Sequence, residues 1–164
     1  MTRWQKIRRG IYITIASIGS MIGVIWYNAP DTPHATPVPY EVQDNGHWRL
    51  LDARSITAQG VTLHFAAGFD QWDGLSIPYQ ATNSLKVTRF DYPEASLWHD
   101  GCFASRLVSK AVADAGLREI LLRSGCATNR TELIVTMLDA WGFAAWDSKT
   151  PESIRRAREL VTVR

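Results

Sequence analysis

A thiol, an imidazole and a predicted helix start stand close together at residues 99–102, His-Asp-Gly-Cys. A cysteine at the N-terminal end of a helix has its thiolate stabilised by unpaired backbone amides and by the helix dipole. His99, three residues earlier, or His64, in a predicted strand, could accept the thiol proton. This spacing gives one hypothesis, a thiol hydrolase with Cys102 as nucleophile and His64 or His99 as base.

A structural role for Cys102 is the alternative. Cys102 and Cys126 are the only two cysteines of the chain, and in an oxidising compartment two thiols are readily joined in one disulfide. Closing the loop between them would stabilise the fold by roughly 3 to 4 kcal/mol through the entropy of the unfolded chain. The sequence favours this disulfide over a catalytic thiol, with two unpaired structural thiols as a further alternative.

Residues 102–108, Cys-Phe-Ala-Ser-Arg-Leu-Val, resemble the nucleophile helix of papain-like cell-wall peptidases. In permuted members of that group the catalytic histidine precedes the cysteine, and His64 is the position that matches. Phe103 and Ala104 replace the small polar residue that usually follows the nucleophile. The resemblance implies cell-wall peptide cleavage by Cys102.

Residues 60–63, Gly-Val-Thr-Leu, and 90–94, Phe-Asp-Tyr-Pro-Glu, resemble the Gly-Asp-Thr and Asp-x-Pro-Glu stretches of the thermonuclease family. Val61 stands where that family has an acidic residue, and its later Asp-x-Tyr-Gly-Arg segment is missing. The resemblance therefore transfers no nuclease site to this chain.

No metal site or cofactor site is predicted. The histidines lack the spacing of a helical zinc motif, and the loop carboxylates lack that of an EF-hand, so we expect them to act as surface groups and turn formers. The residues concerned are His34, His47, His64 and His99, and Asp70, Asp73, Asp91, Glu94 and Asp100.

Two tryptophans are predicted to lie in loops. Trp72 stands between Asp70 and Asp73, and Trp98 is next to His99. Aromatic rings in loops are typical anchors at protein interfaces. Trp72 and Trp98 are therefore the candidates for contact with a protein partner.

An apolar run at residues 10–27 is preceded by four basic residues and contains no charged one. As a helix its 18 residues span about 27 Å, close to the ~30 Å hydrocarbon core of a bilayer. The next basic residue is Arg49, so the positive-inside rule places residues 1–9 in the cytoplasm. A cleaved signal peptide is the alternative, but no small-x-small site ends the run. We expect a single-pass inner (cell) membrane protein with a periplasmic or extracellular domain.

One face of this predicted membrane helix carries small residues. Gly19 and Gly23 have the small-xxx-small spacing that lets two helix backbones approach closely. The small residues of this face, candidates for packing against another membrane helix, are Ala16, Gly19, Ser20 and Gly23.

Composition is that of one folded domain plus an anchor, with 46% hydrophobic and 21% charged residues. The formal net charge is +2, but four of the 18 Lys and Arg precede the apolar run, which leaves 14 against 16 Asp and Glu beyond it. That balance gives no electrostatic footprint for DNA or RNA, so nucleic acid is not an expected partner.

Beyond the anchor the pattern changes twice. Residues 28–44 contain four prolines and predict a stiff linker. From residue 45 apolar side chains alternate over residues 48–50, 61–65, 75–79 and 85–89, which predicts a meander of three to five antiparallel strands, with turns at Gln59-Gly60 and Asp73-Gly74. Pro78 places the third of these strands at an edge.

About three helices are predicted to follow. The first has an apolar face from Phe103 to Ala115, and the second has a capping box at Asn129 and Glu132 and ends at Gly142. Thr150 caps the third, with Pro151 in its first turn. Strands followed by helices predict an α+β domain over residues 45–164.

The sequence carries no complete catalytic set, phosphate loop or metal motif, so no catalytic residue is assigned. It favours a membrane-anchored extracytoplasmic interaction or assembly module, an accessory subunit that joins protein partners of a membrane or envelope complex. The alternative is the cell-envelope thiol hydrolase that uses Cys102 with His64 or His99.

Overall fold

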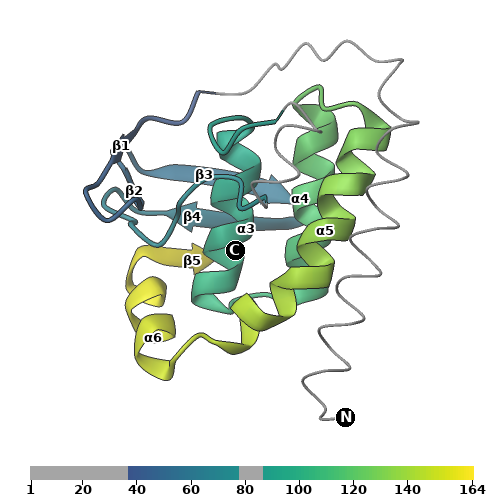
Figure 1. The fold of residues 1–164 in the computed structure, drawn as a ribbon. Helices are drawn as coiled ribbons and strands as arrows, with labels where there is room; N and C mark the ends of the chain where they lie inside the picture. Colours follow the sequence, from purple (N-terminus) through teal and green to yellow (C-terminus); the bar gives the residue numbers. More distant parts are fainter. Residues whose placement is uncertain (1–36, 78–86) are drawn as a thin grey trace.

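The computed structural model describes residues 37–77 and 87–164, which form an α+β domain (Figure 1). The strands are β1 (Tyr40–Val42), β2 (Trp48–Leu50), β3 (Arg54–Ala58), β4 (Val61–Phe65) and β5 (Val161–Val163). The helices are α3 (Pro93–Ser105), α4 (Lys110–Arg123), α5 (Thr128–Asp147) and α6 (Pro151–Leu160). The predicted antiparallel α+β architecture is confirmed at this level.

The predicted membrane helix at residues 10–27 and its packing residues Ala16, Gly19, Ser20 and Gly23 lie outside the described residues. None of the helices in residues 37–77 and 87–164 has the combined length and apolarity needed to cross a bilayer.

Antiparallel pairing joins β1 to β2 in one small sheet, and β3, β4 and β5 in that order in a second. The tight turn between β3 and β4 is made by Gln59 and Gly60, both with positive φ (52° and 71°), which suits a two-residue hairpin loop. Alternate side chains of this hairpin are buried, among them Ile56, Leu63 and Phe65. The predicted strand at 61–65 and the turn before it are confirmed.

The polypeptide is folded before the predicted domain boundary at residue 45. Val38 is buried, Tyr40–Val42 pairs with Trp48–Leu50, and the Tyr40 ring stacks on Trp48 with 4.2 Å between ring centroids. Four prolines suggested a linker as far as residue 44, but the last residues of that stretch pair with a strand that follows them.

A strand predicted from residue 75 is not formed at Leu75–Ile77. Gly74 has a φ of 89° and packs against the Trp48 ring, so the chain turns there. The amide of Leu75 donates to the Arg89 carbonyl (3.1 Å), and that of Ile77 donates to Leu75 itself (2.8 Å). Such a short local turn prevents strand pairing. Residues 78–86 of this prediction lie outside the described part.

The first predicted helix is in fact two. Helix α3 begins at Pro93 and ends at Ser105. The next residue, Arg106, caps it with a left-handed backbone (φ 53°) that directs its N–H to the carbonyl of Cys102. Helix α4 starts anew after Ser109, whose side chain accepts a hydrogen bond from the amide of Val112 (3.3 Å). The apolar spacing runs unbroken through this corner, which is why periodicity alone missed it.

Gly142 does not end α5, which continues to Asp147. A Cβ at this position would stand 3.3 Å from the Phe103 ring, so the glycine permits close packing of α5 rather than a helix end. The predicted capping box at Asn129 is absent too, because α5 starts at Thr128 without a side-chain cap. The start of α6 is confirmed, since Thr150 accepts from the amide of Ser153 (3.2 Å) and Pro151 occupies the first turn.

Helix α6 is followed directly by β5, a strand that the sequence analysis did not predict. Val161, the first residue of β5, pairs with Phe65 at the C-terminal end of β4. The C-terminal segment thus completes the sheet that the β3–β4 hairpin begins.

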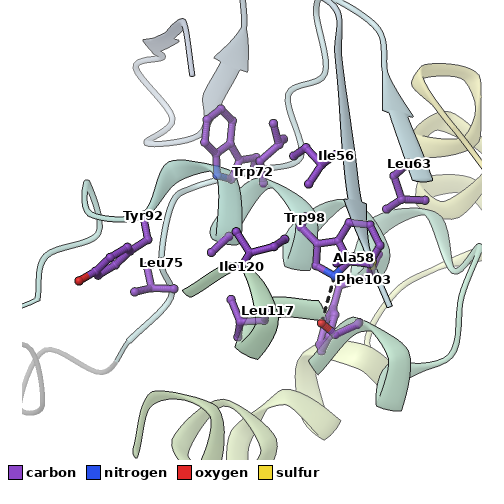
Figure 2. Close-up of a cluster of buried hydrophobic side chains, with 14 of the residues drawn as sticks. Ile56, Ala58, Leu63, Trp72, Leu75, Tyr92, Trp98, Phe103, Leu117 and Ile120 are labelled. Atoms are coloured by element: carbon purple, nitrogen blue, oxygen red, sulfur yellow. Dashed lines mark hydrogen bonds between the residues drawn. The ribbon is translucent and has the colours of Figure 1, made fainter. Parts of the chain in front are cut away.

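Trp98 of α3 lies at the centre of the core, where side chains of β3, α3 and α4 converge (Figure 2). The ring is fully buried, and its Nε1 donates to the Ala113 carbonyl of α4 (3.2 Å). Gly116, one turn further along α4, leaves the space that the indole fills. The close contact between α3 and α4 therefore depends on the large indole of Trp98 and on the absence of a Cβ at Gly116.

We expect Gly116→Ala to destabilise the protein by about 1 to 3 kcal/mol, because its Cβ would overlap the buried Trp98 ring. In an unobstructed helix the same change stabilises the protein by up to about 1 kcal/mol. The sign of the change in unfolding free energy therefore tests whether Trp98 fills the space at Gly116. Ala111→Gly, at an exposed position of α4, is the control and should cost only about 1 kcal/mol. Thermal or urea unfolding measures both; a Gly116→Ala protein at least as stable as wild type contradicts this packing.

Candidate functional site

A cavity of about 200 Å³ opens between α3, the loop that follows β4 and the C-terminal end of α5. We call it the acidic cavity, since two carboxylates contribute to its wall. Its lining residues are His47, Gln71, Trp72, Asp73, Ser76, Asp100, Phe103, Ala145 and Lys149. The loop after β4, helix α3 and the segment that follows α5 thus each supply a charged side chain to one small cavity.

Asp100 and Asp73 form the acidic part of this cavity. The Asp73 amide donates to Oδ2 of Asp100 (3.3 Å), and the Ser76 hydroxyl donates to Oδ1 of Asp73 (2.9 Å). Burial raises the pKa of Asp100, and the nearby charge of Asp73 adds to this, against a lowering by His99. The two carboxylates therefore repel each other, and Asp100 is poorly hydrated.

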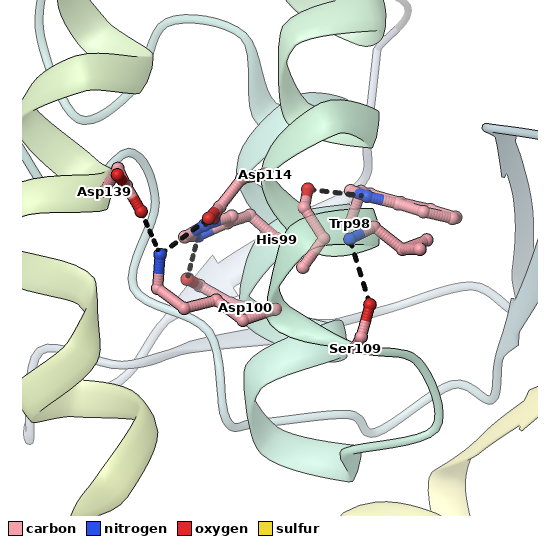
Figure 3. A network of polar contacts seen from close by, with 9 residues as sticks. Trp98, His99, Asp100, Ser109, Asp114 and Asp139 are labelled. Atoms are coloured by element: carbon pink, nitrogen blue, oxygen red, sulfur yellow. Dashed lines mark hydrogen bonds and ion pairs between the residues drawn. The ribbon is translucent and has the colours of Figure 1, made fainter.

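Behind the cavity, His99 lies between two carboxylates (Figure 3). Its Nε2 donates to Oδ1 of Asp114 on α4 (2.9 Å), and its Nδ1 is 3.9 Å from Oδ1 of Asp100. Burial lowers the pKa of His99, but the hydrogen bonds and charges of Asp100 and Asp114 outweigh it and raise the pKa overall. His99 is thus held as a cation between these carboxylates.

Lys110 extends the network to α5. Its ammonium contacts Asp114 (2.6 Å) and Asp139 (2.7 Å), and it lies 4.4 Å from the ring centroid of Phe143. Burial raises the pKa of Asp114, but His99 and Lys110 outweigh it and lower the pKa overall. Asp114 is consequently ionised. It binds one cationic side chain of α3, His99, and one of α4, Lys110.

This network fixes the cavity wall. The His99 ring packs against Phe103 at 4.3 Å between centroids, and Phe103 in turn meets Trp146 edge to face at 4.9 Å. Asp100 and Phe103, which both line the cavity, therefore have partners on their far side. A rigid wall of this kind suits selective binding, because little conformational freedom remains to be lost.

Lys149 is the one positively charged side chain of the lining other than histidine. It is half-buried, and within residues 37–77 and 87–164 its ammonium makes no ion pair and no hydrogen bond. A charged group with no protein partner is available to a ligand. Over the same residues, no three His, Cys, Asp or Glu side chains form a potential metal site.

The thiol site expected at Cys102 is not supported. Helix α3 starts nine residues earlier at Pro93, so Cys102 lies in its interior, fully buried, and not at its N-terminus. Burial raises the pKa of the Cys102 thiol, and the charges of Asp100 and Asp114 add to this. His64 is engaged elsewhere, with Nδ1 2.6 Å from the hydroxyl of Ser55 on the paired strand. A buried, protonated thiol is inert.

The predicted disulfide is not formed in this structure, in which Cys102 and Cys126 are both free and buried. Cys126 follows α4, and burial raises the pKa of its thiol against a lowering by its neighbours Thr131 and Tyr92. The presence of two cysteines in a domain expected to be exported suggested a disulfide. In the fold, however, Cys102 lies within α3 and Cys126 follows α4, and the two thiols are not joined. The alternative of two unpaired structural thiols matches the structure.

Trp72 and Trp98, the predicted interface anchors, are core residues with 1% and 0% of their surface exposed. The Trp72 indole donates to Oγ of Ser96 (2.9 Å), and Trp98 packs against α4 as described. Their neighbours in sequence are polar, which suggested loops. In the folded chain, Trp98 belongs to a helix that the sequence analysis began too late.

Several site residues had no sequence signal. Asp73 and Asp100 were noted only as turn formers, and Lys110, Asp114, Asp139 and Lys149 were not singled out. Asp114 follows His99 by 15 positions across a helix corner, a separation without a recognisable spacing. The buried His99-Asp100 pair next to an apolar helix face was the only available hint.

Comparisons of the chain with protein-family models, with curated proteins and with solved structures find no match. The function therefore has to be argued from the geometry of the cavity.

Free thiols give a direct prediction for the folded and unfolded protein. With no reductant, neither cysteine should react quickly with an alkylating reagent in the native state, because both are buried. In denaturant, still without reductant, two labels should appear by intact mass. Labelling that requires prior reduction would show a disulfide and contradict the structure, and fast native labelling of Cys102 would restore the thiol-enzyme hypothesis.

The raised pKa of His99 predicts a pH-dependent stability. Protonated His99 should stabilise the fold fully below its unfolded pKa of about 6.5, and this contribution should disappear as pH rises through the higher folded pKa. His99→Gln should therefore cost about 1.5 to 3 kcal/mol at pH 6 and less at pH 9. Unfolding measured across this range tests it, with His47→Gln at the surface as control; an equal cost at both pH values contradicts the charged pair.

Proposed function

We propose that the chain is a membrane-anchored extracytoplasmic binding module and that the acidic cavity is its binding site. Residues 10–27 would anchor it in the inner membrane, and the proline-rich stretch after them would hold the domain on the outer side as part of a larger envelope complex. The group recognised in the cavity is positively charged. The observation that carries this proposal is the pair Asp73 and Asp100 in the wall of one small cavity.

Charge complementarity supports a cationic group. Within residues 37–77 and 87–164, the partners of Asp73 and Asp100 are hydrogen-bond donors and the distant Nδ1 of His99, so their negative charge is incompletely balanced. One ion pair at 4 Å is worth about 4 kcal/mol at an effective dielectric constant near 20, before desolvation. A ligand ammonium between the two carboxylates would also remove their mutual repulsion.

The unfavourable free energy of burying charged groups at this site supports a function as well. Burying ionisable groups is unfavourable unless they are fully paired, and Asp100, His99, Asp114 and Lys110 are four largely buried groups joined in one network beside the cavity. Clusters of perturbed groups next to a cavity are typical of functional sites. Binding is favoured over thiol chemistry, because Cys102 is buried and does not line the cavity.

We expect the full-length protein in detergent micelles to bind isoamylammonium chloride, a small cation with an apolar tail, in a calorimetric titration. Asp73→Asn and Asp100→Asn should each weaken this binding at least about tenfold, because each removes one charge from the cavity wall. Asp52→Asn is the matched control, since Asp52 is an exposed carboxylate that does not line the cavity. Its affinity should stay within about twofold of wild type.

Two results would contradict the proposal. One is the absence of any binding heat with isoamylammonium above that with sodium chloride. The other is equal affinity of wild type, Asp73→Asn and Asp100→Asn. Thermal unfolding of each variant shows that it is folded before it is titrated.

A further inference from the structure

We infer that the ligand of the acidic cavity is a small zwitterion, an α-amino acid with an aliphatic side chain, whose ammonium meets Asp73 and Asp100 and whose carboxylate meets Lys149. The inference rests on the proposed binding function and names its ligand class.

The charges of the wall come in both signs. Two carboxylates and one ammonium line the same space, and Lys149 has no ion-pair partner in residues 37–77 and 87–164. A simple cation would satisfy Asp73 and Asp100 but would leave Lys149 unpaired and would be repelled by it. A zwitterion neutralises both, so each unpaired group of the wall obtains a partner.

The volume of the cavity suits a small ligand. Its volume of about 200 Å³ is below the range of roughly 300 to 1,000 Å³ that holds drug-sized molecules. At about 30 Å³ for each water molecule, it corresponds to roughly seven waters. A free amino acid is of this order, whereas a folded partner surface or a long peptide is not.

Apolar groups make up the rest of the wall. Trp72, Phe103 and Ala145 line the cavity together with the polar side chains of Gln71 and Ser76. A ligand with one charged end of each sign and an aliphatic side chain has a partner for every part of this lining. The two aromatic rings are held from behind, Trp72 by its bond to Ser96 (2.9 Å) and Phe103 by His99 and Trp146.

The ends of the wall are positioned by different elements. Asp100 lies on α3 and Asp73 in the loop before it, whereas Lys149 follows the C-terminal end of α5. The network from His99 through Asp114 and Lys110 to Asp139 joins α3 to α5. Helix packing therefore brings the segments that carry the carboxylates and the ammonium to the same cavity.

Three matched probes test the inference with full-length protein in detergent micelles. L-Leucine carries both charges, isoamylammonium lacks the carboxylate, and 4-methylpentanoate lacks the ammonium. We expect leucine to bind at least about tenfold more tightly than either of the others. Lys149→Met should reduce the affinity for leucine to that for isoamylammonium, without weakening isoamylammonium itself; Arg155→Met, at an exposed position of α6, is the control and should change neither.

The outcomes separate this inference from the proposed function. If leucine and isoamylammonium bind equally, or if Lys149→Met leaves leucine binding unchanged, the zwitterion is wrong and the cationic site stands. If no probe binds, the proposed function itself fails. Lys149→Gln, which keeps a polar side chain, provides a second variant and should behave as Lys149→Met does.

Discussion

Asp114 provides the interaction on which the arrangement of the three long helices depends. Its carboxylate binds His99 of α3 with one oxygen and Lys110 of its own helix with the other, and Lys110 reaches Asp139 of α5. Removing one member of such a buried pair destabilises the fold, although the complete pair adds little to stability. What it contributes is a fixed geometry for the helix faces that meet there.

The acidic cavity is a consequence of that geometry. His99 holds Asp100 and Phe103 from behind, and the end of α5 brings Ala145 and Lys149 to the opposite part of the wall. Asp100 is largely buried and incompletely paired, which is unfavourable for the protein alone. Binding of a charged ligand would offset this unfavourable free energy. The same incompletely paired carboxylate therefore destabilises the free protein and favours binding.

Prediction from the sequence succeeded where the signal was local. Alternation of apolar residues located β2 and β4, Gln59-Gly60 located the turn, and Thr150 with Pro151 located the start of α6. It failed where a distant contact decided. Gly142 was interpreted as a helix end, but it accommodates the Phe103 ring, and Arg106 divides one apolar pattern into two helices by a left-handed residue that has no sequence signature.

The sequence by itself determined the fold class, the Gln59-Gly60 turn, the Thr150 cap and a balanced charge beyond residue 27, because these depend on composition or on neighbours within a few positions. Only the tertiary structure decided that Trp72 and Trp98 are core residues, that both cysteines are free, and that Asp73, Asp100 and Lys149 share one cavity. Their separations along the chain follow no helical or strand period. They meet because helix packing brings distant segments together, and no local pattern encodes that contact.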